Sequence, residues 1–490
     1  MATYYIENFG CRATQADAVA IEQRLVDQGH RPAAAEAADL LVVNTCTVTA
    51  SADSRARQAI RGFHRRNPAA QIVVTGCYAQ RAPEELAALG GVRWVIGNAH
   101  QREIPLLLEP APGIPLCPST FARGPERSRM GGTGADFVPL GRLAGEPLRP
   151  GPGAAKILAG HLLELTTVLV GPVERGAGGH TRPTLKIQDG CNNRCAFCVI
   201  PQVRGRSRSL PPEDVVGEIR RLAGAGAREV VLSGINLGSY GRDLVPRTNL
   251  ETLIGRILDE TAIDRLRLSS LEPMHLTADL VDRMAADQRI APHFHIPLQS
   301  GSDRILAAMH RWYRAEHYAR RIELIHERLP NAAIGADVIA GFPGETKADH
   351  RATLALVGRL PFSYLHVFSF SLRPGTEAAR LASLVAPAAI RERASELRLL
   401  AAGKAAAFRL RQHGRLERAL TLETKRDGAT LALTGNYLAV GVRGDWPANR
   451  WVTVRLGDAG NGGLAGELLE DSANWAAAPP SCLSPVAEIL

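Results

Sequence analysis

The chain of 490 residues contains eight cysteines, and six of them form two sets of three that constrain its fold more than any other feature. The compact set is Cys191, Cys195 and Cys198, on a loop after the β-like run 183–188. Three thiolates can hold a [4Fe-4S] cube by three of its irons and leave the fourth iron open. Zinc is the alternative, but structural zinc takes four ligands, usually from two Cys-x-x-Cys knuckles, and the sequence has no second knuckle.

The second set is spread over the first eighty residues and consists of Cys11, Cys46 and Cys77. Cys46 follows 40–43 and Cys77 follows 72–74, two β-branched runs typical of buried parallel strands, with a helix predicted over 51–67. Loops at the ends of parallel strands point the same way, so three distant cysteines can converge at one edge of a sheet. The alternative is three unrelated buried thiols. The pattern favours a second open cluster.

Length and composition predict a cytoplasmic enzyme of about three domains. The net charge is +9, from 58 Lys and Arg against 49 Asp and Glu, which suits an acidic partner without requiring one. The sequence has no apolar stretch of 18 or more residues that would predict a membrane span. Its N-terminus lacks the pattern of a secretory signal, which also disfavours disulfide bonds.

Residues 109–153 contain nine prolines and nine glycines in 45 residues, far above average usage. We expect a disordered or loosely packed insertion there. Cys117 lies inside this stretch and Cys482 lies in a proline-rich tail. A mobile segment preorganises metal ligands poorly, so neither cysteine is expected to be a ligand.

From residue 183 to about 384, apolar strands alternate with glycine-rich turns and amphipathic helices, which predicts a partial (βα) barrel. Further strands are predicted at 229–233, 265–269, 293–297 and 334–339. Polar and glycine residues follow each of these strands. Barrel enzymes bind their ligands at this end, where the βα loops crowd together.

Beyond Pro387 the sequence becomes basic, with ten Lys and Arg and four Glu in 391–426. A helix is predicted over 388–412, and alternating runs at 418–424, 431–434, 437–440 and 451–454 predict a small β-barrel. This density of positive charge would strengthen binding to RNA by counterion release. Tyr437 is a candidate for stacking on a base, with packing inside the barrel as the alternative.

The compact motif, Cys-x-x-x-Cys-x-aromatic-Cys with Phe197 in the aromatic place, resembles the signature of radical S-adenosylmethionine (SAM) enzymes. The resemblance implies that SAM binds the open iron and that electron transfer splits it to a 5′-deoxyadenosyl radical. The three upstream cysteines narrow the similarity to the methylthiotransferases. That family implies two [4Fe-4S] clusters and SAM as cofactors, with all six cysteines as iron ligands.

The resemblance runs from Tyr4 to about Leu456 and implies an α/β fold in three parts. We expect an N-terminal methylthiotransferase domain, a central partial (βα) radical SAM barrel and a C-terminal OB-like barrel of the TRAM type, which binds RNA. The predicted boundaries are 1–108 for the first domain, 109–180 for the insertion and linker, 181–412 for the radical SAM domain, 413–470 for the TRAM-like domain and 471–490 for the tail.

Segments after the predicted barrel strands resemble the SAM-contacting segments of the family, although each alone is also compatible with an ordinary turn and helix cap. The cofactor-binding candidates are Phe197, Gly234, Asn236, Ser270, Glu272, Gln299 and Ser300. Basic residues near the compact motif and in the C-terminal domain are candidates for RNA phosphates, with a solvated basic turn as the alternative. These are Arg204, Arg206, Arg208, Lys425 and Arg426.

Residues 44–49, 234–241 and 368–376 look most like the branch that converts N6-threonylcarbamoyladenosine at tRNA position 37 to its 2-methylthio derivative. The branch implies two SAM per reaction, binding of the tRNA anticodon stem-loop and a flavodoxin-like electron donor, and it leaves the source of sulfur open. One position departs from the family pattern, with Thr14 where relatives usually have asparagine. Its hydroxyl can still bond a cluster sulfide or the neighbouring backbone.

Three alternatives compete with this hypothesis. A sister methylthiotransferase would act on isopentenyladenosine in tRNA or on an aspartate of a ribosomal protein. A radical SAM sulfur-insertion enzyme would consume its auxiliary cluster and transfer no methyl group. A non-catalytic iron-sulfur RNA-binding protein would not cleave SAM under reducing conditions.

Overall fold

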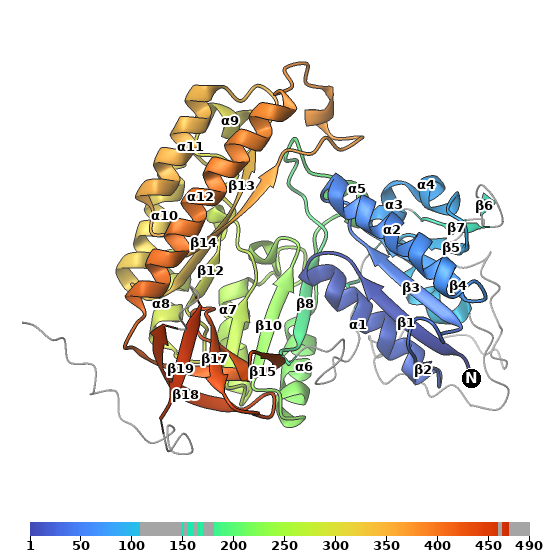
Figure 1. The fold of residues 1–490 in the computed structure, drawn as a ribbon, viewed down its shortest axis with the longest axis horizontal. Coiled ribbons are helices and arrows are strands. Elements are labelled where there is room, and N and C mark those ends of the chain that lie inside the picture. Colours follow the sequence, from blue (N-terminus) through green and yellow to red (C-terminus); the bar gives the residue numbers. More distant parts are fainter. Residues whose placement is uncertain are drawn as a thin grey trace, which may run out of the picture.

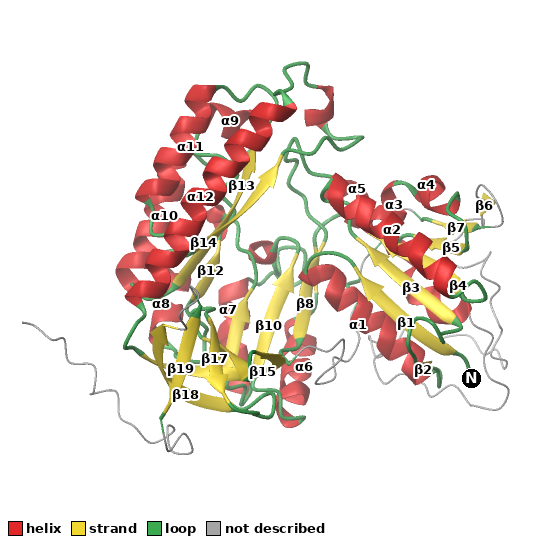
Figure 2. Cartoon of the chain, in the orientation of Figure 1, coloured by secondary structure: helices red, strands yellow, loops and turns green. Residues whose placement is uncertain are grey.

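The fold was analysed in a computed structural model that describes residues 1–107, 149–150, 155–160, 162, 165, 167–169, 181–458 and 463–469 (Figure 1). The described chain forms an α/β layer, a partial barrel and a small β-barrel, so the predicted three-part fold is confirmed (Figure 2). Cys117, Cys482, the tail and most of the predicted insertion lie outside the described residues. Among the described helices, none has the length and apolarity needed to cross a lipid bilayer.

The N-terminal layer is a seven-stranded sheet in the order β2-β1-β3-β4-β5-β7-β6, parallel except for β6. Its strands are β1 (Thr3–Asn8), β2 (Arg31–Pro32), β3 (Leu40–Thr45), β4 (Gln71–Gly76), β5 (Val92–Ile96), β6 (Arg149–Pro150) and β7 (Lys156–Leu158). Helix α1 (Arg12–Asp27) and the 3-10 helix η1 (Asn98–Leu107) cover one face, and α2 (Ala50–Arg66), α3 (Cys77–Arg81) and α4 (Pro83–Ala87) cover the other. The predicted strands at 40–43 and 72–74 and the helix at 51–67 are confirmed.

Strand β7 lies within 109–180, the segment predicted to be an insertion and linker. It pairs in parallel with β5, and Ile157 and Leu158 are buried in the sheet. Three residues are too few to show a strand period among prolines and glycines. The structure therefore adds two short strands from this segment, β6 and β7, to the first sheet, which the composition did not predict.

The central unit is a partial barrel built from two adjoining sheets, β11-β10-β8-β9 and β12-β13-β14. Its strands are β8 (Thr184–Asp189), β9 (Arg208–Ser209), β10 (Glu229–Gly234), β11 (Arg265–Leu268), β12 (His293–His295), β13 (Ala333–Ala340) and β14 (Tyr364–Ser369). Its helices are α5 (Ile200–Arg204), α6 (Pro212–Gly224), α7 (Leu250–Glu260), α8 (Ala278–Ala286), α9 (Asp303–Ala308), α10 (Ala315–Arg328), α11 (Lys347–Arg359) and α12 (Pro387–Arg411). Each predicted barrel strand overlaps an observed one.

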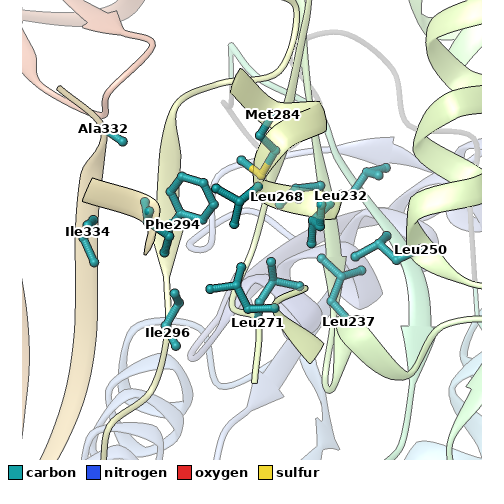
Figure 3. Close-up of a cluster of buried hydrophobic side chains, with 14 of the residues drawn as sticks. Leu232, Leu237, Leu250, Leu268, Leu271, Met284, Phe294, Ile296, Ala332 and Ile334 are labelled. Carbon is teal, nitrogen blue, oxygen red and sulfur yellow. The ribbon is translucent and has the colours of Figure 1, made fainter. Parts of the chain in front are cut away.

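Side chains of the barrel strands alternate between an apolar outer face and a polar inner face. Leu232, Leu268, Phe294 and Ile334 belong to the cluster that packs against the surrounding helices (Figure 3). Charged or polar residues occupy several of the positions between them, such as Arg267 on β11 and His295 on β12. This period of two gives the barrel a polar interior, where ligands can be bound.

The C-terminal unit is a closed β-barrel in the order β15-β16-β17-β19-β18, as predicted. Its strands are β15 (Leu416–Arg426), β16 (Ala429–Thr434), β17 (Ala439–Arg443), β18 (Trp451–Asp458) and β19 (Leu464–Leu468). Tyr437 stacks on His293 of the central barrel, with 4.4 Å between ring centroids. The ring of Tyr437 therefore packs against the central barrel and not inside the small one, and stacking on a base stays a prediction.

A buried ion cluster joins the small barrel to the central one. Glu229 is fully buried and pairs with Arg265 and Arg267 of the neighbouring strand β11. Arg267 also donates to the carbonyl oxygens of Gly435 at 2.9 Å and Thr434 at 3.1 Å. Burial alone would raise the pKa of Glu229, but the two arginines outweigh burial and lower the pKa to about 2.

This pKa predicts an acid-sensitive attachment of the small barrel. A carboxyl group with a depressed pKa stabilises the fold at pH values above its ordinary pKa near 4.5, and this stabilisation is lost as the pH falls towards 2. We expect Glu229→Gln to lower the free energy of unfolding by about 3 kcal/mol at pH 7. In urea unfolding, the wild-type midpoint should approach that of the variant as the pH falls from 6 to 3. The exposed Glu260→Gln is the control, and a difference that stays constant with pH would refute the assignment.

Candidate active site

The three cysteines of the spread set lie at the carboxyl ends of parallel strands. Cys11 follows β1 and stands at the N-cap of α1 without a capping side-chain hydrogen bond, Cys46 follows β3, and Cys77 follows β4. Burial, together with the charges of Cys77 and Cys11, raises the pKa of Cys46 to about 12. The three sulfur atoms are therefore close enough to repel one another as free thiolates.

Close packing of the cysteine loops depends on glycine. Gly10 has φ +140°, and a Cβ atom there would lie 2.8 Å from the Cβ of Cys46. Gly76 has φ +95°, and its Cβ would lie 2.4 Å from the carbonyl oxygen of Thr45. Both contacts are too short for any side chain, so these glycines allow the loops to converge. Thr14 donates to the carbonyl oxygen of Cys11 at 2.7 Å, one of the two partners expected for its hydroxyl.

N–H donors surround these sulfur atoms. The backbone N–H of Val48 lies 3.5 Å from Cys46 Sγ, and Cys77 Sγ accepts from Arg204 Nε at 3.3 Å and Asn98 Nδ2 at 3.7 Å. A thiol that coordinates a metal loses its proton, and hydrogen bonds to sulfur stabilise iron-sulfur clusters. Three converging free thiols with such donors fit a cluster held by three ligands.

The compact set shows the same design at the end of β8. Cys191 Sγ accepts from the backbone N–H of Asn193 at 3.4 Å and from Asn236 Nδ2 at 3.8 Å. Cys195 Sγ accepts from Arg311 Nη1 at 3.4 Å. Burial raises the pKa of Cys198 to about 12, with further contributions from the charges of Cys195 and Cys191. This set also fits a cluster held by three thiolates.

A cavity lies beside Cys198 of the compact set. Phe197 and Cys198 line it, and Gln299 lines it from the loop that follows β12. Thr49, which caps α2 three residues after Cys46, lines the cavity from the N-terminal layer. The structure therefore brings two predicted cofactor-binding residues, Phe197 and Gln299, into one cavity that both units enclose.

Three other predicted cofactor-binding residues gather beside the compact set. Gly234 lies against Gln188, because a Cβ there would be 2.9 Å from Gln188 Oε1. That oxygen accepts from the backbone N–H of Asn236 at 2.7 Å, and Asn236 Oδ1 is buried without a hydrogen-bond partner among the described residues. Glu272 forms an ion pair with Arg311, the residue that contacts Cys195. Polar groups that could bind a cofactor, such as Asn236 Oδ1, therefore lie next to the compact set.

Two predicted cofactor-binding residues have other partners. Ser300 is fully buried, and its hydroxyl accepts from the backbone N–H of Ser302 at 3.2 Å and contacts Thr353 Oγ1 at 3.4 Å. In this structure the hydroxyl supports its own loop, and a contact with the cofactor stays a prediction. The Ser270 hydroxyl forms a hydrogen bond with His295 Nδ1 at 2.6 Å and so orients the ring of a histidine inside the barrel.

Of the five residues predicted to contact RNA phosphates, some are buried and others are exposed. Arg204 and Arg208 are buried and form ion pairs with Asp189, so their prediction as RNA contacts is wrong. Arg206 is exposed between them. Lys425 and Arg426 are also exposed, and each pairs with a solvent-facing aspartate. These three side chains remain free to meet phosphates.

Arg204 belongs to a buried charge cluster that links the N-terminal layer to the central barrel. Its guanidinium group donates to Asp17 on α1 at 2.7 Å and to Asp189 at the end of β8 at 3.0 Å. Lys186 on β8 pairs with the same two carboxylates. Arg204 also contacts Cys77, and Asp189 precedes the compact set by two residues. The cluster therefore fixes the two cysteine sets relative to each other.

Sequence reasoning missed several residues of this site, including Asp17, Arg311, His295, Asp337 and His366. His295, Asp337 and His366 carry a detectable signal. Each is a polar residue that alternates with apolar neighbours along a strand of the barrel, a pattern that predicts an inward position for the polar side chain. Asp17 and Arg311 carry no such signal, since charged residues are common on helices and in loops.

Comparison with known proteins agrees with this geometry. The family described as "Uncharacterized protein family UPF0004" matches residues 3–97, and the radical SAM superfamily matches residues 185–357. A solved radical SAM methyltransferase, TsrM from Kitasatospora setae, is similar over 77% of each chain, with a TM-score of 0.51 and 17% identity. That likeness concerns the fold. The barrel and its compact cysteine motif define a radical SAM enzyme.

Curated relatives narrow the class. The threonylcarbamoyladenosine tRNA methylthiotransferase MtaB of Aquifex aeolicus is 36% identical over 451 residues, which cover 92% of this chain and 99% of the relative. MtaB of Bacillus subtilis is 33% identical over 91% of each chain. A tRNA-2-methylthio-N(6)-dimethylallyladenosine synthase of Corynebacterium urealyticum is 33% identical over 81% of this chain and 68% of its own. The chain belongs to the radical SAM methylthiotransferase family, as the cysteine pattern predicts.

The buried charge cluster generates a prediction about stability. Arg204→Met would leave Asp17 and Asp189 with fewer cationic partners in a buried site, which should cost about 3–5 kcal/mol in the free energy of unfolding. Arg206→Met, two residues away and exposed, is the matched control and should change it little. Anaerobic urea unfolding measures both. Equal midpoints for the two variants would show that the cluster does not stabilise the fold.

Proposed function

We propose that this enzyme adds a methylthio group to C2 of N6-threonylcarbamoyladenosine at position 37 of tRNA, using two [4Fe-4S] clusters and two SAM molecules. The observation that carries the proposal is a cavity lined by Cys198 of the compact set and by Thr49, which follows Cys46 by three residues. A radical source and a sulfur carrier must both reach one substrate atom, and a substrate in this cavity would lie beside the compact set and near the loop of Cys46.

When bound, the clusters would supply the electron that cleaves SAM and the sulfur to be transferred, chemistry that amino-acid side chains lack. The chain itself supplies binding and shielding. Glu272, Arg311 and Asn236 offer an anion, a cation and an amide beside the compact set, which suit the ammonium and carboxylate groups of SAM. Phe197 and Phe370 line the cavity and exclude water from it. An aromatic C–H bond has no acid–base route at neutral pH, so the reaction requires a radical.

The choice of substrate rests on the relatives. The match extends over 99% of the Aquifex MtaB chain but over 68% of the Corynebacterium dimethylallyladenosine enzyme. Agreement over the whole length supports the threonylcarbamoyl substrate over its sister. The anticodon stem-loop is then the tRNA element that enters the cavity, and the cytoplasm is the compartment. A small flavodoxin-like protein would donate electrons, and a separate sulfur donor would replenish the transferred atom.

Nucleoside mass spectrometry of tRNA from cells with and without the gene tests the substrate. We expect the 2-methylthio derivative of N6-threonylcarbamoyladenosine to vanish in the deletion strain and to return with the wild-type gene. Loss of the 2-methylthio derivative of isopentenyladenosine instead would establish the sister activity. A deletion that changes neither nucleoside would contradict methylthiolation of tRNA.

Two cysteine variants separate the roles of the two sets. After anaerobic reconstitution, wild-type protein should hold about eight irons, and Cys195→Ala and Cys46→Ala about four each. Cys195→Ala should form no 5′-deoxyadenosine, whereas Cys46→Ala should still cleave SAM but transfer no methylthio group. Iron analysis and chromatography of the products measure both effects. Near-normal SAM cleavage by Cys195→Ala would refute the radical role of the compact set.

Lys425 and Arg426 on the small barrel are candidates for the RNA surface, since both are exposed and their surface ion pairs are weak. The double variant Lys425→Glu, Arg426→Glu should bind tRNA more weakly. It should reduce the slope of log affinity against log salt by about one to two. Filter binding at several salt concentrations measures the slope, with the exposed Arg320→Glu on α10 as the control. Equal slopes would exclude this face of the barrel.

A further inference from the structure

Three side chains that could ligate a metal ion meet inside the central barrel. His295 on β12, Asp337 on β13 and His366 on β14 come from three adjacent parallel strands. One ligand atom of each lies within 4.8 Å of the corresponding atoms of the other two. No other group of three His, Cys, Asp or Glu in the described part of the chain meets this condition.

The register of the strands explains how these residues meet. His295 pairs with Gly335 and Asp337 pairs with His366, so the three side chains lie on neighbouring positions of one sheet face. Their neighbours on the other face, such as Phe294 and Val338, belong to the apolar core. The three ligand atoms therefore point into the barrel and away from the core.

Ser270 orients His295 for metal binding. Its hydroxyl bonds His295 Nδ1 at 2.6 Å and leaves Nε2 to face Asp337. Nε2 is buried and lies 3.1 Å from Asp337 Oδ1, yet it has no partner in a hydrogen bond of good geometry among the described residues. A histidine that ligates a metal typically uses its other ring nitrogen in this kind of hydrogen bond.

We propose that His295, Asp337 and His366 bind one divalent transition-metal ion on the inner wall of the barrel. Two imidazole nitrogens and one carboxylate oxygen suit Zn²⁺ or Fe²⁺, and three protein ligands leave a coordination position open. Ligand atoms about 2 Å from a shared ion lie about 3 Å apart, close to the separation of His295 Nε2 and Asp337 Oδ1. Asp337 also lines the cavity, so the open position faces the substrate.

The open position would take an anionic oxygen of the substrate. This step rests on the proposed function, in which the modified adenosine carries a threonyl carboxylate. Carboxylate oxygen is a good ligand for a metal of this type, whereas the dimethylallyl group of the sister substrate has no ligand atom. The ion would thus recognise the side chain of the modified base while the clusters act at its ring.

Zinc binding tests the site without any substrate. Full-length protein with both clusters reconstituted, so that the cysteines are occupied, is treated with a chelator and dialysed against Zn²⁺ alone. We expect one zinc per chain, bound at least tenfold more weakly by Asp337→Asn and His366→Ala. His317→Ala, an exposed histidine on α10, should bind zinc as the wild type does. Equal zinc binding by wild type and both variants would overturn the proposal.

A second measurement applies even if the variants fold poorly. X-ray absorption at the zinc edge of wild-type protein should show nitrogen and oxygen ligands at about 2.0–2.1 Å. Sulfur ligands at about 2.3 Å would place the zinc at cysteines and refute the site. Cluster absorbance and circular dichroism that match the wild type identify variants suitable for the dialysis.

Nucleoside binding separates this inference from the proposed function. Removal of zinc should weaken binding of N6-threonylcarbamoyladenosine at least tenfold and leave binding of isopentenyladenosine unchanged. Zinc bound at the site with no effect on either nucleoside would refute the carboxylate role alone. A stronger effect on isopentenyladenosine would refute the proposed substrate while the metal site stood.

Discussion

The active site depends on one buried electrostatic arrangement, the contact of Arg204 with Asp17 and Asp189. The N-terminal layer and the central barrel each carry one cysteine set, and both units contribute residues to the lining of the cavity. Buried charges are costly unless paired, so the two units can separate only by exposing or orphaning these ions. Because of this free-energy cost, a few short hydrogen bonds fix the position of the two cysteine-bearing units relative to each other. Catalytic geometry is thereby set by charge pairing across an interface.

The same arginine illustrates why part of the site was predictable and part was not. Cysteine spacing and apolar strands such as 40–43 and 72–74 are local patterns, and both predictions are confirmed by the fold. A basic run beside a reactive centre predicts contacts with phosphate, and Arg204 belongs to such a run. Its actual partners are Asp17 and Cys77, far away in the sequence. A charge can be counted from sequence, but its partner is decided by tertiary packing.

The polar interior of the barrel shows a second limit. Parallel strands covered by helices are commonly apolar on both faces, so a polar inner face is not predicted by the fold class alone. Alternation in β11 and β12 places Arg267, His293 and His295 inside the barrel. Arg267 bonds the backbone of the small barrel, His293 stacks on Tyr437, and His295 bonds Ser270 of the central barrel. A polar residue at every second position of a barrel strand is therefore an informative sequence signal. The positive charge that the basic C-terminal segment can offer to RNA is also smaller than its composition predicts. Arg393, for example, is buried and paired with Glu345.

Cys11 gives one further consequence through its place at the N-cap of α1. The first turn of this helix has no acidic residue and no side-chain cap, so a cluster at Cys11 would itself satisfy the positive end of the helix. Oxidative loss of the cluster would fray that turn, and Asp17 lies in the next one. Damage by oxygen would then loosen the interface between the two units and expose its backbone to proteases. A molecule that has lost this cluster would then be degraded faster than an intact one, because its interface between the two units opens more often.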